Sequence, residues 1–346
     1  MSRLEALGAQ LDTPLLVTNQ TNVFYLTGFE SSNAALLVRP GGETTLYTDF
    51  RYAEEARRVD GVECVITRRA MMRDVGERLS GRVQFEADVL PYLEWERLNA
   101  GKAKLEATHG LVDSVRAVKE EEEVRKLRRA ARIADRALEA LTAETWVGKT
   151  ERQVAWRLRE LCHAHGADDR AFESIVAAGP NGARPHGRPT ESVIEKNTLV
   201  TIDWGVQADG YYSDCTRTFS TGGVLPDRLR EAYDVTLVAQ KKAVAGIKAG
   251  MTGVEADRIA RDVIDDAGFG EHFGHGLGHG VGLQVHEAPR LSTESEDTLM
   301  PGHCVTVEPG IYLPGLGGVR IEDLAIVRED GLEVLTSFPK ELIEVA

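Results

Sequence analysis

The sequence predicts an α+β protein with two domains, a smaller α/β domain over residues 1–118 and a larger domain over residues 119–346 that carries the recognisable chemistry. Three observations indicate this arrangement. The first third of the chain alternates short apolar runs with helical segments. An acidic run with helical periodicity begins just after residue 118. The remainder combines long helices with two predicted hairpins that each carry two acidic residues.

The first domain is expected to alternate strands and helices. Clusters of apolar and β-branched residues predict strands at 15–18, 34–38, 44–48, 62–66 and 83–86. Helical spacing predicts helices at 52–59, 71–79 and 91–100, the last of which begins with a proline. A domain of this length falls within the usual size range of independently folded units.

Four consecutive glutamates, Glu120 to Glu123, mark the expected start of the second domain. Acidic residues favour the N-terminal turn of a helix, and apolar residues follow at helical spacing from Val124 to Leu141. We therefore interpret the charge run as the solvated start of a helix rather than a binding patch. Helices of this domain are predicted at 120–143, 150–165, 227–248 and 254–267.

The first predicted hairpin, residues 198–220, places two acidic side chains on one face. If its turn is centred on Asp209-Gly210, Asp203 faces Thr216 and Asp214 lies diagonally; if the turn is centred one residue earlier, Asp203 lies opposite Asp214. Both registers put the carboxylates on the same face, because side chains alternate along a strand. The alternative interpretation is a surface hairpin whose acids face solvent.

The second predicted hairpin, residues 305–323, also carries a pair of acidic side chains. A turn centred on Gly315 pairs Glu308 directly with Glu322. Like charges opposite each other destabilise a strand pair, and both acids follow β-branched residues in apolar strands. A second acidic pair of this kind is difficult to explain as chance.

Histidines come from a glycine-rich segment, residues 273–282, which contains His275 and His279 and is followed by His286. Two histidines four residues apart often bind zinc on a helix, but five glycines in ten residues argue against a helix here. Glycine instead allows backbone to approach a crowded site. The alternative is a glycine loop with solvent-exposed histidines.

Four carboxylates around one imidazole would repel one another in an apolar pocket, so the pattern predicts a metal site and hydrolytic chemistry. The predicted ligands are Asp203, Asp214, His279, Glu308 and Glu322. Oxygen-rich ligation with a single imidazole suits Mn(II) or Co(II) at least as well as Zn(II).

In this order and spacing, the motifs resemble the dinuclear metallopeptidases of the pita-bread fold, and within them the Xaa-Pro branch formed by prolidase and aminopeptidase P. The matching motifs are Ile-Asp-Trp-Gly (202–205), Ser-Asp-Cys-Thr-Arg-Thr (213–218), His-Gly-Leu-Gly-His (275–279), Val-His-Glu (285–287), Glu-Pro-Gly-Ile-Tyr (308–312) and Val-Arg-Ile-Glu-Asp (319–323). The resemblance implies a pita-bread catalytic domain preceded by a creatinase-type α/β domain.

The resemblance also implies roles for the ligands. Two divalent ions would be bridged by Asp214 and Glu322. Asp203 would bind one ion, and His279 and Glu308 would complete the other. Glu308 would also serve as the general base and then the general acid.

Further residues are implied on the substrate side. His186, His275 and His286 match histidines that contact substrate during catalysis, and Tyr312 and Arg320 match neighbouring positions. A dipeptide carries a free carboxylate that needs a cation in a partly dry, acidic site. Arg320 and Arg51 are candidates for this contact, and the alternative for Arg51 is an ordinary surface ion pair.

The expected activity is hydrolysis of the Xaa-Pro bond, from Xaa-Pro dipeptides as in prolidase. The alternatives are an aminopeptidase P that acts on longer Xaa-Pro peptides and an inactive binding protein of the same fold. A net charge of −14 argues against nonspecific nucleic-acid binding. Neither a signal peptide nor a long apolar run is apparent, and four scattered cysteines suit a reducing cytoplasm. The resemblance implies a homodimer.

Overall fold

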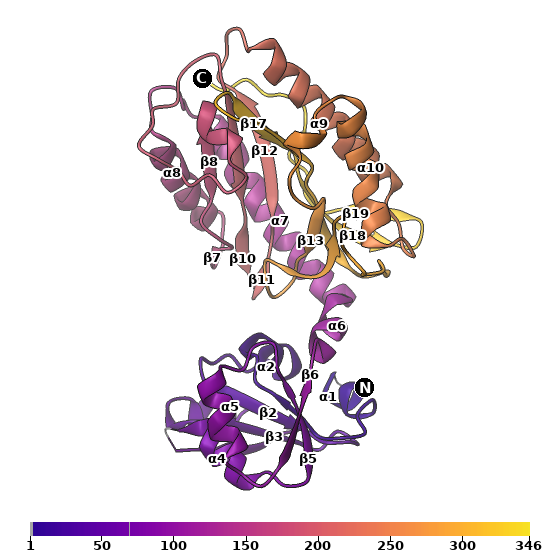
Figure 1. Ribbon diagram of the computed structural model, residues 1–346. Helices are drawn as coiled ribbons and strands as arrows, with labels where there is room; N and C mark the ends of the chain where they lie inside the picture. Colours follow the sequence, from indigo (N-terminus) through magenta and orange to yellow (C-terminus); the bar gives the residue numbers. More distant parts are fainter. Residues whose placement is uncertain (1–2, 69) are drawn as a thin grey trace. The chain divides into compact units, whose positions relative to one another are not determined.

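The computed structural model describes residues 3–68 and 70–346 and divides the chain into two compact units, Met1–Arg116 and Ala117–Ala346 (Figure 1). Each unit mixes helices and strands, which confirms the expected α+β class.

The first unit is built on one six-stranded sheet with the strand order β4-β3-β2-β1-β5-β6. Its strands are β1 (Leu15–Val17), β2 (Ala34–Val38), β3 (Thr44–Thr48), β4 (Glu63–Ile66), β5 (Arg82–Glu86) and β6 (Lys104–Thr108). The β1–β2 and β2–β3 pairs are antiparallel, and the other pairs are parallel. The five strands predicted from sequence are confirmed to within one residue at each end.

The helices of the first unit show where the sequence was less informative. They are α1 (Arg3–Gly8), α2 (Gln20–Thr27), the 3₁₀ turn η1 (Phe50–Tyr52), α3 (Ala53–Ala56), α4 (Met71–Arg78), α5 (Tyr92–Asn99) and α6 (Leu111–Ala117). The helix predicted at 52–59 is wrong in length, since only a 3₁₀ turn and four α-helical residues form there. The elements α1, α2, β6 and α6 were not predicted.

The second unit contains two pairs of packed helices, α7 with α8 and α9 with α10 (Figure 1). Their bounds are α7 (Glu121–Thr142), α8 (Glu151–Ala164), α9 (Asp227–Gly246) and α10 (Gly253–Asp266). All four predicted helices are therefore confirmed. Capping boxes at Glu120, Thr150 and Thr252 satisfy backbone N–H groups at three of the four N-termini.

Short strands lie between the helix pairs. They are β7 (Asp169–Arg170), β8 (Ile175–Ala178), β9 (Leu199–Trp204), β10 (Val206–Ala208), β11 (Tyr211–Tyr212), β12 (Cys215–Ser220), β13 (Gly278–Gly280), β14 (Glu287–Leu291), β15 (Cys304–Val307), β16 (Gly310–Leu313), β17 (Gly317–Arg320), β18 (Asp323–Arg328) and β19 (Gly331–Val334). The 3₁₀ turns η2 (Gly179–Ala183) and η3 (Gly270–His272) complete the unit. Two large buried clusters of apolar side chains pack the strands against the helices.

The first hairpin adopts one of the two registers considered from sequence. Asp203 pairs with Thr216, and the turn is Asp209-Gly210, both with positive φ (52° and 80°). Asp214 consequently lies diagonally across from Asp203. Positive φ at both turn residues suits the tight hairpin turn that an Asp-Gly pair favours.

The second hairpin has the predicted register, but its ladder is interrupted at the two acids. Gly310 pairs with Arg320 on one side of the interruption, and Val307 pairs with Asp323 on the other. At the interruption, the Glu308 N–H donates to the carbonyl of Leu277, and the Glu322 N–H donates to the carbonyl of Thr216. The predicted direct pairing of the two glutamates is therefore wrong, because each backbone bonds to another element.

The glycine-rich histidine segment is not helical, as predicted, and part of it forms β13. No helix among residues 3–68 and 70–346 has the length and apolar character required to cross a bilayer.

Candidate active site

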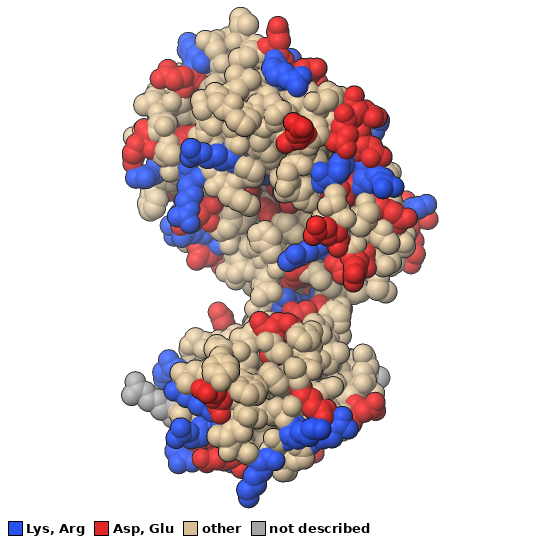
Figure 2. Space-filling model, in the orientation of Figure 1, with Lys and Arg blue, Asp and Glu red and all other residues tan. Residues whose placement is uncertain are grey.

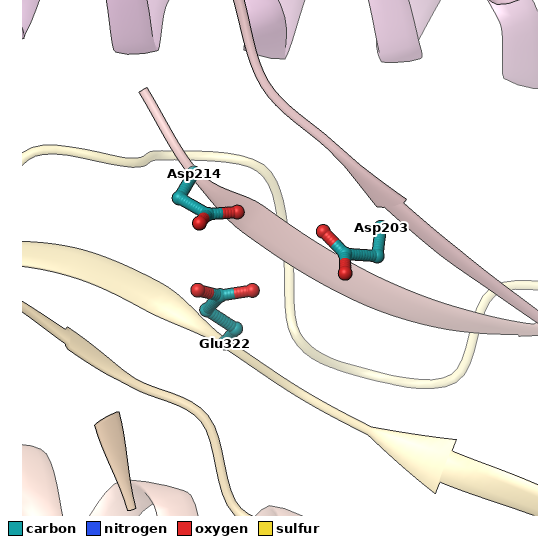
Figure 3. A group of neighbouring side chains, drawn as sticks. All are labelled: Asp203, Asp214 and Glu322. Carbon is teal, nitrogen blue, oxygen red and sulfur yellow. The ribbon is translucent and has the colours of Figure 1, made fainter. Parts of the chain in front are cut away.

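Three acidic side chains of the second unit point toward a common space (Figure 3). Asp203, Asp214 and Glu322 each place a carboxylate oxygen within 4.8 Å of the other two. Asp203 lies in β9, Asp214 immediately precedes β12, and Glu322 lies between β17 and β18. The structure thus brings acids from both hairpins to one place.

Two oxygen atoms of this cluster are buried without a hydrogen-bond partner among the described residues. They are Oδ1 of Asp203 and Oε1 of Glu322. The other oxygens of these groups are satisfied, since Asp203 Oδ2 accepts from Arg320 at 2.7 Å and Glu322 Oε2 accepts from Thr216 at 2.6 Å. Leaving a buried carboxylate oxygen unsatisfied is costly, so the free oxygens fit a site for cations.

The electrostatics of the cluster lead to the same conclusion. Burial raises the pKa of Asp214 and of Glu322 well above the usual carboxyl range, and repulsion from neighbouring acids raises each further. Burial also raises the pKa of Glu308. These shifts disfavour the ionised forms of Asp214, Glu308 and Glu322 unless positive charge compensates, and hard oxygen ligands of this kind suit divalent ions.

His279 is oriented as a metal ligand would be. Its Nε2 lies 3.3 Å from Glu308 Oε1 and 3.7 Å from Asp214 Oδ2. Its Nδ1 lies 3.1 Å from the carbonyl oxygen of Gly280, which can only accept, so we assign the proton to Nδ1. Burial lowers the pKa of His279, which favours the neutral ring and leaves a lone pair on Nε2. A lone pair facing carboxylates is repulsive without a cation, and the Nδ1 bond is the usual support of a metal-bound imidazole.

Arg320 lies beside the acids with a partner for each of its guanidinium nitrogens. It donates to Asp203, to the Tyr312 hydroxyl at 2.8 Å, to Thr216 at 3.1 Å and to the carbonyl of Pro185 at 3.2 Å. The side chain is only 4% exposed. Arg320 therefore holds Asp203 in place, and each of its three nitrogens is already bonded to the protein.

His275 lies next to this arginine network. Its Nδ1 is 2.8 Å from the carbonyl oxygen of Gly276, so we place the proton there, and its Nε2 accepts from the Tyr312 hydroxyl at 2.9 Å. Burial lowers the pKa of His275 and favours this neutral form. Both ring nitrogens thus have partners, and the imidazole fixes the hydroxyl that Arg320 also contacts.

A cavity of about 840 Å³ opens onto the cluster, and His186 and His286 are exposed along it. The ring centroid of His286 lies 4.1 Å from that of His279. Burial, followed by the proximity of His279, lowers the pKa of His286 to about 4. The structure thus places every predicted site residue of the second unit along the cavity except Tyr312. The Tyr312 hydroxyl is bonded to His275 and Arg320, which do line the cavity.

Arg51 belongs to the first unit. It lies in η1, and its guanidinium donates to both carboxylate oxygens of Asp49, at 2.9 and 2.7 Å. Its side chain is 53% exposed.

Three positions at the site were missed by sequence reasoning. Thr216 and Thr306 donate to Glu322 and Glu308 at 2.6 and 3.1 Å. Strand alternation was the available signal, because each threonine lies two residues from an acid on its own strand. Arg290 lines the cavity, and no local pattern in the sequence marks it.

The comparisons with known proteins identify the class. Residues 125–329 match the model of metallopeptidase family M24, and residues 4–118 match the creatinase/prolidase N-terminal domain. The chain belongs to the M24 metallopeptidases and is a hydrolase that depends on divalent metal ions.

Several relatives resemble the chain along its whole length. A curated Xaa-Pro dipeptidase from Pyrococcus horikoshii is 36% identical, over 95% of this chain and 94% of the relative. A structure of an Xaa-Pro dipeptidase from Bacillus anthracis is 40% identical with a TM-score of 0.95, covering 99% of both chains. An X-Pro aminopeptidase from Thermotoga maritima MSB8 is 32% identical with a TM-score of 0.87, covering 96% of this chain and 97% of that one. The expected pita-bread fold with a creatinase-type N-terminal domain is therefore confirmed.

Proposed function

We propose that this chain hydrolyses the bond between an N-terminal residue and proline, with Xaa-Pro dipeptides as its preferred substrates. The observation that carries the proposal is the buried carboxylate cluster, in which oxygens of Asp203 and Glu322 lack partners and His279 directs a lone pair inward. Full-length similarity to proteins named Xaa-Pro dipeptidase supports the choice of bond.

The cluster suits two divalent ions, and its donor set favours Mn(II) or Co(II), with Zn(II) as the alternative. Asp203, Asp214 and Glu322 would hold the ions together with His279 and Glu308. When bound, the ions supply a water of lowered pKa and a Lewis acid for the scissile carbonyl.

Glu308 is the proposed proton shuttle. Its carboxyl group lines the cavity beside the acids, where it can act as a general base. Thr306 donates to Oε1 at 3.1 Å, and Arg320 Nε lies 3.9 Å from Oε2, so the group is held in one orientation. In this role it accepts a proton from the attacking water and delivers it to the leaving proline nitrogen.

The exposed histidines of the cavity are the proposed substrate contacts. His186 and His286 line the cavity beside the acids and reach the scissile carbonyl or the ends of the peptide. His275 acts with them by fixing the Tyr312 hydroxyl, with Arg320 on its other side. A bond to proline has no N–H, so the site need not provide an acceptor at that position.

A dipeptide preference requires a cation for the free carboxylate. Besides Arg320, the cavity lining includes Arg188 and Arg290, and we propose Arg290 for this contact. Its guanidinium makes no hydrogen bond or ion pair with any residue that the structure describes, and it lies close enough to His279 and His286 to lower the pKa of both rings. The sequence-based candidate Arg51 is already bonded twice to Asp49.

These candidates are separated by measuring kcat/KM on Ala-Pro and on Ala-Pro-Ala. We expect Arg290→Ala to lose activity selectively on the dipeptide, since only the dipeptide presents its carboxylate next to proline. Arg51→Ala is expected to affect both substrates equally. A selective loss for Arg51→Ala would instead assign the carboxylate contact to Arg51.

The activity itself is tested with the unaltered, metal-loaded protein on Ala-Pro, Ala-Pro-Ala and Ala-Ala. The proposal predicts turnover of the two proline peptides and preference for Ala-Pro. Preference for Ala-Pro-Ala would assign the chain to the aminopeptidase P alternative. Absence of turnover with Mn, Co and Zn would favour a binding protein of the same fold.

We also propose a cytoplasmic homodimer. The four cysteines are all free thiols, and Cys215 and Cys304 are fully buried, which is compatible with a reducing compartment. On the face shown in Figure 2, acidic and basic side chains are interspersed over both units. Light scattering of the purified protein tests the dimer, which a monomeric mass would exclude.

A further inference from the structure

Helix α10 carries an ion pair to which the proposed function assigns no role. Asp257 is 1% exposed, and Arg261 follows it one helical turn later. The guanidinium contacts both carboxylate oxygens, at 2.6 and 2.9 Å. Such bidentate geometry fixes both side chains more strongly than a single contact would.

The remaining hydrogen bonds of the pair all reach the backbone of the glycine-rich histidine segment. Asp257 Oδ1 accepts from the N–H of Leu277 at 2.9 Å. Arg261 donates to the carbonyls of Phe273 and His275, at 3.0 and 2.8 Å. Its guanidinium also lies over the Phe273 ring, 4.2 Å from the centroid. Both partners of the ion pair therefore hold the same short stretch of chain.

This stretch is connected to two residues with proposed roles at the site. His275 belongs to it and accepts from the Tyr312 hydroxyl. The carbonyl of Leu277 accepts from the N–H of Glu308 at 2.8 Å, at the point where the second hairpin ladder is interrupted. A displacement of Leu277 would therefore move the backbone of the proposed proton shuttle.

We propose that Asp257 and Arg261 are positioning residues that fix segment 273–277 and, through it, His275 and Glu308. The inference rests on the proposed function of those two residues. Neither member of the pair lines the cavity, so both act through the segment rather than on the substrate. Glycines give the segment conformational freedom, and bonds to a rigid helix remove it.

The test replaces Arg261 with methionine in the metal-loaded enzyme and measures kcat and KM on Ala-Pro. We expect kcat to fall about 10- to 100-fold, because a misplacement of about 1 Å can cost about 100-fold. At saturating metal, KM and the number of bound ions should change little, since every proposed ligand is retained. The matched control is Arg258→Met, which removes an exposed arginine from the same helix and should leave kcat unchanged.

Two further measurements separate positioning from general destabilisation. Arg261→Lys keeps the charge but loses the planar fork, so it should recover only part of kcat, and it replaces the methionine variant if that variant does not fold. Millimolar guanidinium ion added to Arg261→Ala should restore part of the turnover.

Unchanged kcat in folded, metal-loaded Arg261→Met or Arg261→Lys would overturn the proposal. A fall in kcat that merely follows a loss of bound metal would overturn it as well. Failure of the proposed function is distinguishable, because the unaltered enzyme would then show no Xaa-Pro turnover.

Discussion

Gly278→Ala is expected to damage the site although it adds a single methyl group. A Cβ at this position would lie 2.2 Å from the carbonyl oxygen of Thr306 and 2.7 Å from its Oγ1. The first distance is about 1.2 Å short of the 3.4 Å at which ordinary contact begins. The obstacle is backbone, so β13 and β15 must move apart. The same threonine hydroxyl bonds the N–H of His279 and the carboxylate of Glu308.

The expected magnitudes follow from this geometry. Overpacking of a well-packed region costs about 1–3 kcal/mol. For a unit of this size that corresponds to a lowering of the melting temperature by about 2–12 °C. The strand movement approaches 1 Å at a proposed metal ligand and at the proposed proton shuttle, so kcat should fall about 100-fold.

Gly274→Ala provides the matched control, because its Cβ would meet nothing within 4 Å. Thermal unfolding, bound metal and turnover on Ala-Pro should be measured for both variants. The control should lie within about 0.5 kcal/mol of the unaltered protein. Equal stability and turnover in the two variants would show that the close approach at Gly278 is not required.

The remaining predictions concern metal and proton transfer. A chelator should abolish activity and Mn(II) or Co(II) should restore it, whereas full activity in metal-free protein would contradict the whole assignment. Glu308→Gln should lower turnover about 10²–10⁴-fold at saturating metal, and a loss below about tenfold would exclude Glu308 as the shuttle. His279→Ala should lose bound metal, while His286→Ala should lower turnover with metal retained. The opposite pattern of metal counts would exchange the roles of these histidines.

The two hairpins show which features of the site could be predicted from the sequence and which could not. Side-chain alternation placed Asp203 and Asp214 on one face in either register, and the Asp209-Gly210 turn left only the choice between registers open. The interruption of the second ladder at Glu308 could not be foreseen. It depends on the carbonyl of Leu277, which is distant in sequence and competes for the same N–H.

Other features were missed because distant contacts decide them. Helix α2 has many residues of low helix propensity, and its buried Asn22 donates to Glu86, 64 residues away, at 2.6 Å. The positions of Arg290 in the cavity and of Asp257 beneath the histidine segment likewise depend on the assembled fold. Local patterns identified the acids and histidines, but not the side chains that orient them.

The carboxylate cluster lies at a seam, by which we mean the place where two separate sheets meet. Asp203 belongs to the sheet of β8, β9 and β12, whereas His279 belongs to that of β13, β14, β15, β18 and β19. Without cations, mutual repulsion acts across this seam. Ion binding therefore contributes directly to the folding free energy of the second unit, by about 2.7 kcal/mol at a free ion concentration 100 times the dissociation constant. Metal availability would thus affect the stability of this enzyme as well as its rate.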